Sequence, residues 1–342
     1  MTTATDSIGT AAVALQVHPG PWTRQAKQKA IQEETRAAFQ AYFRKSVKTR
    51  NWTPWDDMPL HEMGERGHLL SDDTVTLIES FLGVEDYVGD YVEDSMVIVG
   101  KMRERRNVQL QWGAEELKHA ESWELVLLHS GRRTQEELDT DRDKVAEHKW
   151  TMRENHPGLD TPLGVCVYAM VQERATYFNY DELRKRIRTE YDLPEKVTAE
   201  ERTRGKQVGA AGAFKIVAKD VIALHAIFLQ MFDIYKKYLP YEAFDTLFRV
   251  LGSFNMPALY LIPNESEMRE ALYRTKLYTP LKHGRYVANP ILDALGLENK
   301  RALERAVQEA KHLPAGLGPQ QVTLSRTGEW VVSMNAESAV TI

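Results

Sequence analysis

Glu116 and His119 stand three residues apart in a run, residues 112–119, whose pattern predicts a helix. Residues at this spacing lie one above the other, so a carboxylate and an imidazole share one face of the helix. Oxygen and nitrogen ligands together favour iron or manganese over metals that prefer thiolates. The pair alone is a weak signal, because helices are rich in both residue types. Whether the pair indicates a metal site depends on whether neighbouring helices provide further ligands.

Three other predicted helices each carry a residue that can bind metal, namely Glu93, Glu173 and His225. Glu173 and His225 stand among apolar neighbours, where a polar group is costly unless it is paired or bound to metal. Each has a structural alternative. A lone buried histidine is more often a hydrogen-bonded core residue, a buried glutamate can pair with a base, and Glu93 alone would be solvated surface. Together with Glu116 and His119, these residues predict a metal site between four long helices.

Helical periodicity covers most of the chain, with capping residues and helix breakers between the segments. The pattern predicts an all-α fold. We expect four long helices, over residues 85–103, 107–129, 161–190 and 206–238. Residues 23–47 also have helical spacing, shorter helices start at 71 and 134, and further ones lie near 241–253, 264–274 and 286–310.

We expect a disordered tail over residues 1–20, a helical domain over 21–312 and a C-terminal extension over 313–342. In the extension, Gln321–Leu324 and Glu329–Val332 read as short strands that form either a hairpin or an ordered tail.

Composition narrows the classes of function. The chain has 342 residues and a net charge of −5, which gives no support for nucleic-acid binding. A single cysteine, Cys166, excludes an intramolecular disulfide framework and fits a reducing compartment. The first residues lack the basic segment of a secretory signal, and no apolar stretch is long enough to span a bilayer. We therefore expect a cytoplasmic protein.

From about Trp52 to Tyr260, the chain resembles the soluble acyl-carrier-protein desaturases of plastids and actinobacteria. Two motifs are specific: residues 112–119 match W-x-A-E-E-N-R-H except at two positions, and residues 172–176 are Q-E-R-A-T. Weaker matches support them, at residues 92–96 (T-E-D-N-L in the family), 224–228 (L-H-x-I-F), 52–54 and 255–258.

This resemblance implies a ferritin-like bundle with two irons. By the motifs, the metal ligands would be Glu93, Glu116, His119, Glu173 and His225, with Glu116 bridging the irons. It also implies that the Thr176 hydroxyl assists proton delivery at the oxygen-binding face. Trp52 and Trp112 match tryptophans near the route of electrons to the irons.

One position departs from the family, which has a second Glu-x-x-His. Three residues before His225 this chain has Ile222, which cannot bind metal. The nearest acid, Asp220, is turned about 140° from His225 on a regular helix at roughly 100° per residue. Asp220 is therefore either a replacement ligand, through a π-bulge, or an outer partner of His119. The site would then hold two irons with water in the gap, one iron or manganese, or none.

The resemblance also implies partners: an acyl chain on acyl carrier protein or coenzyme A, a ferredoxin-type electron donor and a second copy of the chain in a homodimer. Acidic carrier proteins favour basic docking surfaces, for which Arg103–Arg106 and Arg184–Arg188 are candidates, although such runs are usually solvated helix ends. We expect an acyl tunnel along apolar residues that would otherwise be simple core: Met96, Val99, Val165, Val167, Met170 and Val171.

Three alternatives remain open. The chain could catalyse a different oxidation on the same scaffold, which Ile222 favours, or bind acyl groups or carriers without catalysis. Buried charges without a metal would only cost stability, which argues against the non-catalytic reading. An iron store of the ferritin type is opposed by the length of the chain beyond a four-helix bundle.

Overall fold

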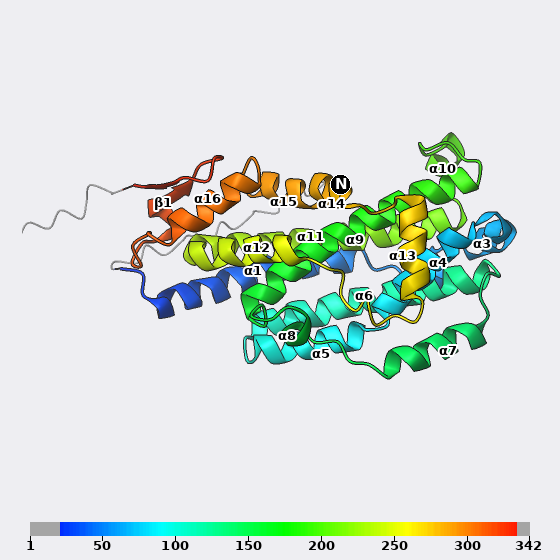
Figure 1. The fold of residues 1–342 in the computed structure, drawn as a ribbon, viewed down its shortest axis with the longest axis horizontal. Helices are drawn as coiled ribbons and strands as arrows, with labels where there is room; N and C mark the ends of the chain where they lie inside the picture. Colours follow the sequence, from blue (N-terminus) through cyan, green and yellow to red (C-terminus); the bar gives the residue numbers. More distant parts are fainter. Residues whose placement is uncertain (1–20, 334–342) are drawn as a thin grey trace, which may run out of the picture.

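The computed structural model describes residues 21–333, and these are mostly helical (Figure 1). The tail expected over residues 1–20 and the last part of the expected extension, residues 334–342, lie outside the described residues. The longest helices are α1 (Arg24–Thr49), α4 (Asp72–Glu85), α6 (Arg103–His129), α9 (Pro162–Glu190), α11 (Gly209–Tyr238) and α12 (Pro240–Ser253), and α5 (Val88–Val99) lies between α4 and α6 in the chain.

Shorter elements connect and cover these helices. They are α2 (Pro54–Asp57), α3 (Leu60–Arg66), the 3₁₀ turn η1 (Gly67–Leu69), α7 (Gln135–Ala146), α8 (Met152–Asn155), α10 (Ala199–Arg204), α13 (Glu265–Thr275), α14 (Pro280–His283), the π-helical turn η2 (Gly284–Ala288), α15 (Asn289–Ala294), α16 (Lys300–Ala310), the 3₁₀ turn η3 (Pro319–Gln321), and strands β1 (Val322–Leu324) and β2 (Trp330–Val332). No helix among the described residues is long and apolar enough to cross a membrane.

Side chains at the helix starts explain where the helices begin. The Ser71 hydroxyl accepts a hydrogen bond from the backbone of Thr74 and caps α4. Thr134 and Glu137 form a reciprocal capping box at the start of α7. Thr161 caps α9, whose first residue is Pro162, a position where the missing N–H costs nothing. These three starts agree with the sequence pattern to within one residue.

Helices α9 and α11 run side by side through the centre of the molecule, and α6 packs against both α4 and α5 (Figure 1). Two aromatic pairs join α6 to α11. Trp123 stacks on Phe214 with ring centroids 4.3 Å apart, and Trp112 meets the edge of Phe228 at 6.2 Å. The order of these contacts shows that α6 and α11 are antiparallel.

The two aromatic pairs belong to two separate apolar clusters of the core. Trp112 and Phe228 lie in one cluster, and Trp123 and Phe214 in the other. Between Trp112 and Trp123, the same face of α6 carries polar residues that are also buried. The polar layer is thus enclosed at both ends by packed apolar side chains.

Two expected helices differ from those observed. Residues 85–103 were expected as one helix, but α4 ends at Glu85 and α5 covers only Val88–Val99. The expected helix over 286–310 is divided into η2, α15 and α16. Gly296 has a positive φ of 82°, which an α-helix does not allow, and so separates α15 from α16. Beyond them, β1 and β2 pair antiparallel with Thr323 opposite Val331, so the hairpin alternative holds.

Candidate metal centre

Glu85, Glu116 and His119 form a buried group whose ligand atoms all lie within 4.8 Å of one another. Glu85 is the last residue of α4, and the other two occupy one face of α6. The Nδ1 atom of His119 is 2.7 Å from Oε2 of Glu116. Two carboxylates and one imidazole in an apolar interior are a donor set that fits a single iron or manganese ion.

Glu173 of α9 adds a third buried carboxylate beside Glu116. The indole N–H of Trp112 bridges the two, lying 2.7 Å from Oε1 of Glu116 and 2.7 Å from Oε1 of Glu173. Glu85 is held separately, because its Oε1 accepts a hydrogen bond of 2.7 Å from the Tyr180 hydroxyl. Indole and phenol donors therefore orient all three carboxylates before any cation binds.

The carboxylates perturb one another strongly. Burial and then the charge of Glu116 raise the pKa of Glu85 and of Glu173 well above the usual range. Burial opposes ionisation of Glu116, but the charge and hydrogen bond of His119 outweigh it and lower the pKa of Glu116. Burial also works against protonation of His119, yet the neighbouring Glu116 raises the pKa of His119 to about 10. The group thus favours a positive charge at its centre.

Behind His119, the side chains of Trp52, Lys118 and Arg50 surround Asp220 of α11. Oδ2 of Asp220 accepts hydrogen bonds from the indole of Trp52 at 2.7 Å and the ammonium of Lys118 at 2.8 Å. The same oxygen lies 3.9 Å from Nε2 of His119, and Arg50 lies 3.5 Å from Oδ1. The structure therefore places Asp220 on the far side of His119 from Glu116, as an outer partner and not as a member of the ligand group.

Glu93 does not join the group, and its assignment as a ligand is corrected. Its side chain is 63% exposed and pairs with Lys149 on the outside of α5. The physical reason is the break after Glu85, because α5 begins as a new helix and turns Glu93 to solvent. Glu85 fills the place instead. The sequence signal that could have found it is an acid placed directly after the apolar run of residues 81–84.

His225 is also outside the group. Its Nδ1 is 2.8 Å from the carbonyl oxygen of Met170, so this nitrogen carries the proton and donates it to α9. Burial lowers the pKa of His225 to about 4. The alternative of a hydrogen-bonded core histidine describes this residue, and the prediction of ligation is corrected.

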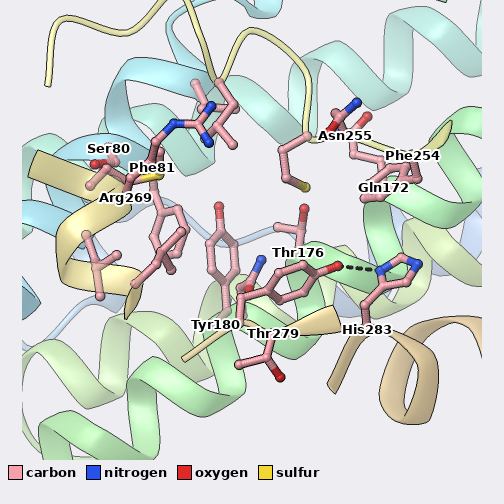
Figure 2. A pocket seen from close by; sticks show the side chains of 18 of the residues that line it. Ser80, Phe81, Gln172, Thr176, Tyr180, Phe254, Asn255, Arg269, Thr279 and His283 are labelled. Carbon is pink, nitrogen blue, oxygen red and sulfur yellow. Dashed lines mark hydrogen bonds between the residues drawn. The ribbon is translucent and has the colours of Figure 1, made fainter. Parts of the chain in front are cut away.

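A cavity of about 560 Å³ opens beside the centre, with Glu85, Thr176 and Tyr180 in its wall. Its lining is mostly apolar, including Phe81 and the residues Leu77, Val84, Leu251, Met256, Leu259, Met268 and Leu272. Figure 2 shows Thr176 and Tyr180 facing the open space, with Arg269 and His283 at opposite sides. The Thr176 hydroxyl is buried and has no hydrogen-bond partner among the described residues, so it is free to bond a molecule inside the cavity.

The cavity is not where the sequence pattern placed the tunnel. Val167, Met170 and Val171 are fully buried in the core cluster that contains Trp112 and do not line the cavity. Met96 and Val99 do not line this cavity either, and Val165 lines a much smaller hollow. The face of α9 that borders the cavity carries Gln172, Thr176, Asn179 and Tyr180. This more polar face of the helix lies across the cavity from α4.

The candidate docking runs are largely neutralised. Arg188 is fully buried and pairs with Glu201 at 2.6 Å, and Arg184 and Arg186 pair with acids on their own helix. In the other run, Arg105 is buried and bonds the carbonyl of Pro162. Arg103 and Arg106 remain exposed.

A comparison with protein-family models finds no match to this chain, and no curated protein matches it.

Proposed function

We propose that this protein is a metal-dependent oxidoreductase of the acyl-carrier-protein desaturase type, built on a ferritin-like bundle. It would introduce a double bond into a carrier-bound acyl chain, or otherwise oxidise it, with O2. The observation that carries the proposal is the juxtaposition of the Glu85, Glu116 and His119 group with the cavity, whose wall includes Glu85 itself. A chain lying in this cavity would pass directly beside the centre.

Iron bound to this group would supply the oxygen activation that an unactivated methylene requires. The residues around it supply positioning and shielding. The apolar lining from α4 and α13 excludes water and accepts a hydrocarbon chain. The unpartnered Thr176 hydroxyl can hold a proton at Oγ1 on the cavity side.

The outer residues fit an input of electrons from outside. Trp52, Asp220 and His119 make a continuous path of contacts, 2.7 Å and then 3.9 Å, from the partly exposed indole to the buried group. A ferredoxin-type protein is the proposed donor. Because Asp220 is fully buried, any electron passing along this path avoids solvent.

Two partners belong to the same proposal. Acyl carrier protein would deliver the chain, and Arg269, which borders the cavity and also pairs with Glu265 of its own helix, offers a positive charge for its acidic surface. A second copy of the chain would cover the exposed apolar residues of the α5–α6 face. Val97 is 74% exposed, and Leu110 and Leu117 are each 54% exposed.

The test is turnover of defined substrates. Protein loaded anaerobically with ferrous iron is given saturated chains of several lengths, on acyl carrier protein or on coenzyme A, with a ferredoxin system and O2. Mass spectrometry of the acyl product distinguishes the loss of two hydrogens from the gain of one oxygen. The proposal predicts one of these changes, and its loss in Glu116→Gln. No oxidation of chains on carrier protein or coenzyme A would contradict the proposal.

A further inference from the structure

We infer that this centre holds one metal ion, on Glu85, Glu116 and His119, because two aliphatic side chains of α11, Val221 and Leu224, occupy the place of a second set of ligands. This inference rests on the proposed metal-dependent function and concerns the number of ions. It departs from the two irons that the motifs implied.

The aromatic pairs fix which residues of α11 face the centre. On α6, Trp112 and Trp123 are eleven residues apart, about three turns, so they share a face with Glu116 and His119. On α11, Phe214 and Phe228 are fourteen residues apart, about four turns. Since the helices are antiparallel, the midpoint of one segment lies opposite the midpoint of the other.

The midpoint on α6 falls between Glu116 and His119, and the midpoint on α11 falls at Val221. An independent contact supports this alignment, because Asp220, next to Val221, approaches Nε2 of His119 to 3.9 Å. Leu224 lies one turn further toward Phe228, on the same face. Val221 is fully buried and Leu224 is 1% exposed, so both pack in the interior at the level of the centre.

Among the described residues, the only other donor of α11 at this level is Asp220, whose carboxylate is already bonded to Trp52 and Lys118. Ile222 and His225 each lie one position beyond Val221 and Leu224, about 100° further round the helix. His225 is accordingly bonded to the carbonyl of Met170. The remaining carboxylate, Glu173, is held by the indole of Trp112 and faces Glu116 without a nitrogen ligand beside it. A second cation would have only Glu173 and a shared Glu116.

The experiment counts ions in the full chain. Purified protein is loaded with ferrous iron without oxygen, freed of excess metal by gel filtration, and analysed for metal and protein. We expect about one ion per chain, against about two for a carboxylate-bridged pair. Loading with Mn(II) gives an independent readout by electron paramagnetic resonance, where an isolated ion shows six lines and a coupled pair shows many more.

Variants identify the cause. Val221→Glu with Leu224→His restores a Glu-x-x-His on the inner face and should raise the count to about two. Ile222→Glu, beside the existing His225, should leave it at about one. Circular dichroism checks that each variant is folded, and the counts for the unmodified chain stand even where a variant does not fold. Two ions in the unmodified chain, a coupled manganese spectrum, or a gain through Ile222→Glu would overturn the inference. No bound metal would instead overturn the proposed function.

Discussion

Asp220 lies 3.9 Å from Nε2 of His119, on the side of the ring opposite Glu116. Its Oδ2 is already held by Trp52 and Lys118, so the carboxylate cannot rotate away without breaking two hydrogen bonds. A carboxylate behind a histidine fixes the ring and raises the basicity of the ligating nitrogen. The indole of Trp52, in the loop before α2, and the ammonium of Lys118, on α6, are thereby connected to the centre through the side chain of Asp220.

Asp220→Asn should weaken metal binding by about 10–100-fold, the usual effect of losing an outer partner of a ligating histidine. The measurement is a competition titration with a chelator of known affinity. Asp233→Asn, on the outer part of the same helix, is the matched control and should bind metal as the unmodified chain does. Equal affinities for the two variants would show that Asp220 does not support the centre.

Glu116→Gln should lose more affinity than Asp220→Asn, because it removes a ligand atom and the charge that holds His119. Glu93→Gln is the informative control, since Glu93 occupies the motif position but pairs with Lys149 at the surface. Its metal content should be unchanged. A loss of metal in Glu93→Gln equal to that in Glu116→Gln would place the centre elsewhere than the structure does.

Much of the architecture follows from local signals. Helix starts at Ser71, Thr134 and Thr161 depend on side chains a few residues away, and the sequence contains them. Glu116 and His119 could also be grouped from sequence, because residues three apart on one helix share a face wherever that helix packs. These predictions require no knowledge of neighbouring helices.

The remaining site residues depend on helix phase, which tertiary packing sets. A shift of one residue along a helix turns the side chain direction by about 100°. A motif residue that is displaced by one position therefore points away from the site. His225 is such a residue, because the pairs Trp112–Phe228 and Trp123–Phe214 turn Leu224 inward instead. Glu93 fails for a similar reason, since the break after Glu85 resets the phase of α5.

Thr176→Val tests the hydroxyl in the cavity wall. Valine keeps the shape, and the hydroxyl has no partner among the described residues, so stability should be unchanged or slightly higher. If the hydroxyl delivers a proton, kcat for the acyl substrate should fall about 100-fold. Thr246→Val, whose hydroxyl bonds only its own helix, is the control and should retain full activity. Full activity of Thr176→Val would remove this residue from the reaction.

Glu201 should make the protein sensitive to acid. Arg188, fully buried and 2.6 Å away, helps to lower the pKa of Glu201 to about 2 despite the opposing effect of burial. A carboxyl whose pKa is lower in the folded state stabilises the fold above its ordinary pKa of 4.5, and this contribution is lost as the pH falls toward 2. Breaking the pair with Glu201→Gln should cost about 3–5 kcal/mol at pH 7.

Urea unfolding at several pH values measures the free energy of unfolding of the unmodified chain and of Glu201→Gln. The difference between their free energies of unfolding should become smaller as the pH falls from 4.5 to 2, because Glu201 of the unmodified chain takes up a proton in this range. Glu270→Gln breaks only the exposed pair with Arg274 and should cost less than about 1 kcal/mol. If the difference in free energy of unfolding stays constant across this pH range, the charge of Glu201 contributes nothing to the stability of the fold.

With the metal-dependent function proposed above, the buried group of Glu85, Glu116 and His119 would make the folded chain a competitor for metal in the cell. A cation that binds this group, and not the unfolded chain, stabilises folding by about 2.7 kcal/mol at a concentration a hundred times its dissociation constant. A difference of that size changes how often a protein is exposed to proteases. The steady amount of this protein should therefore follow the supply of its metal, apart from any control of its synthesis.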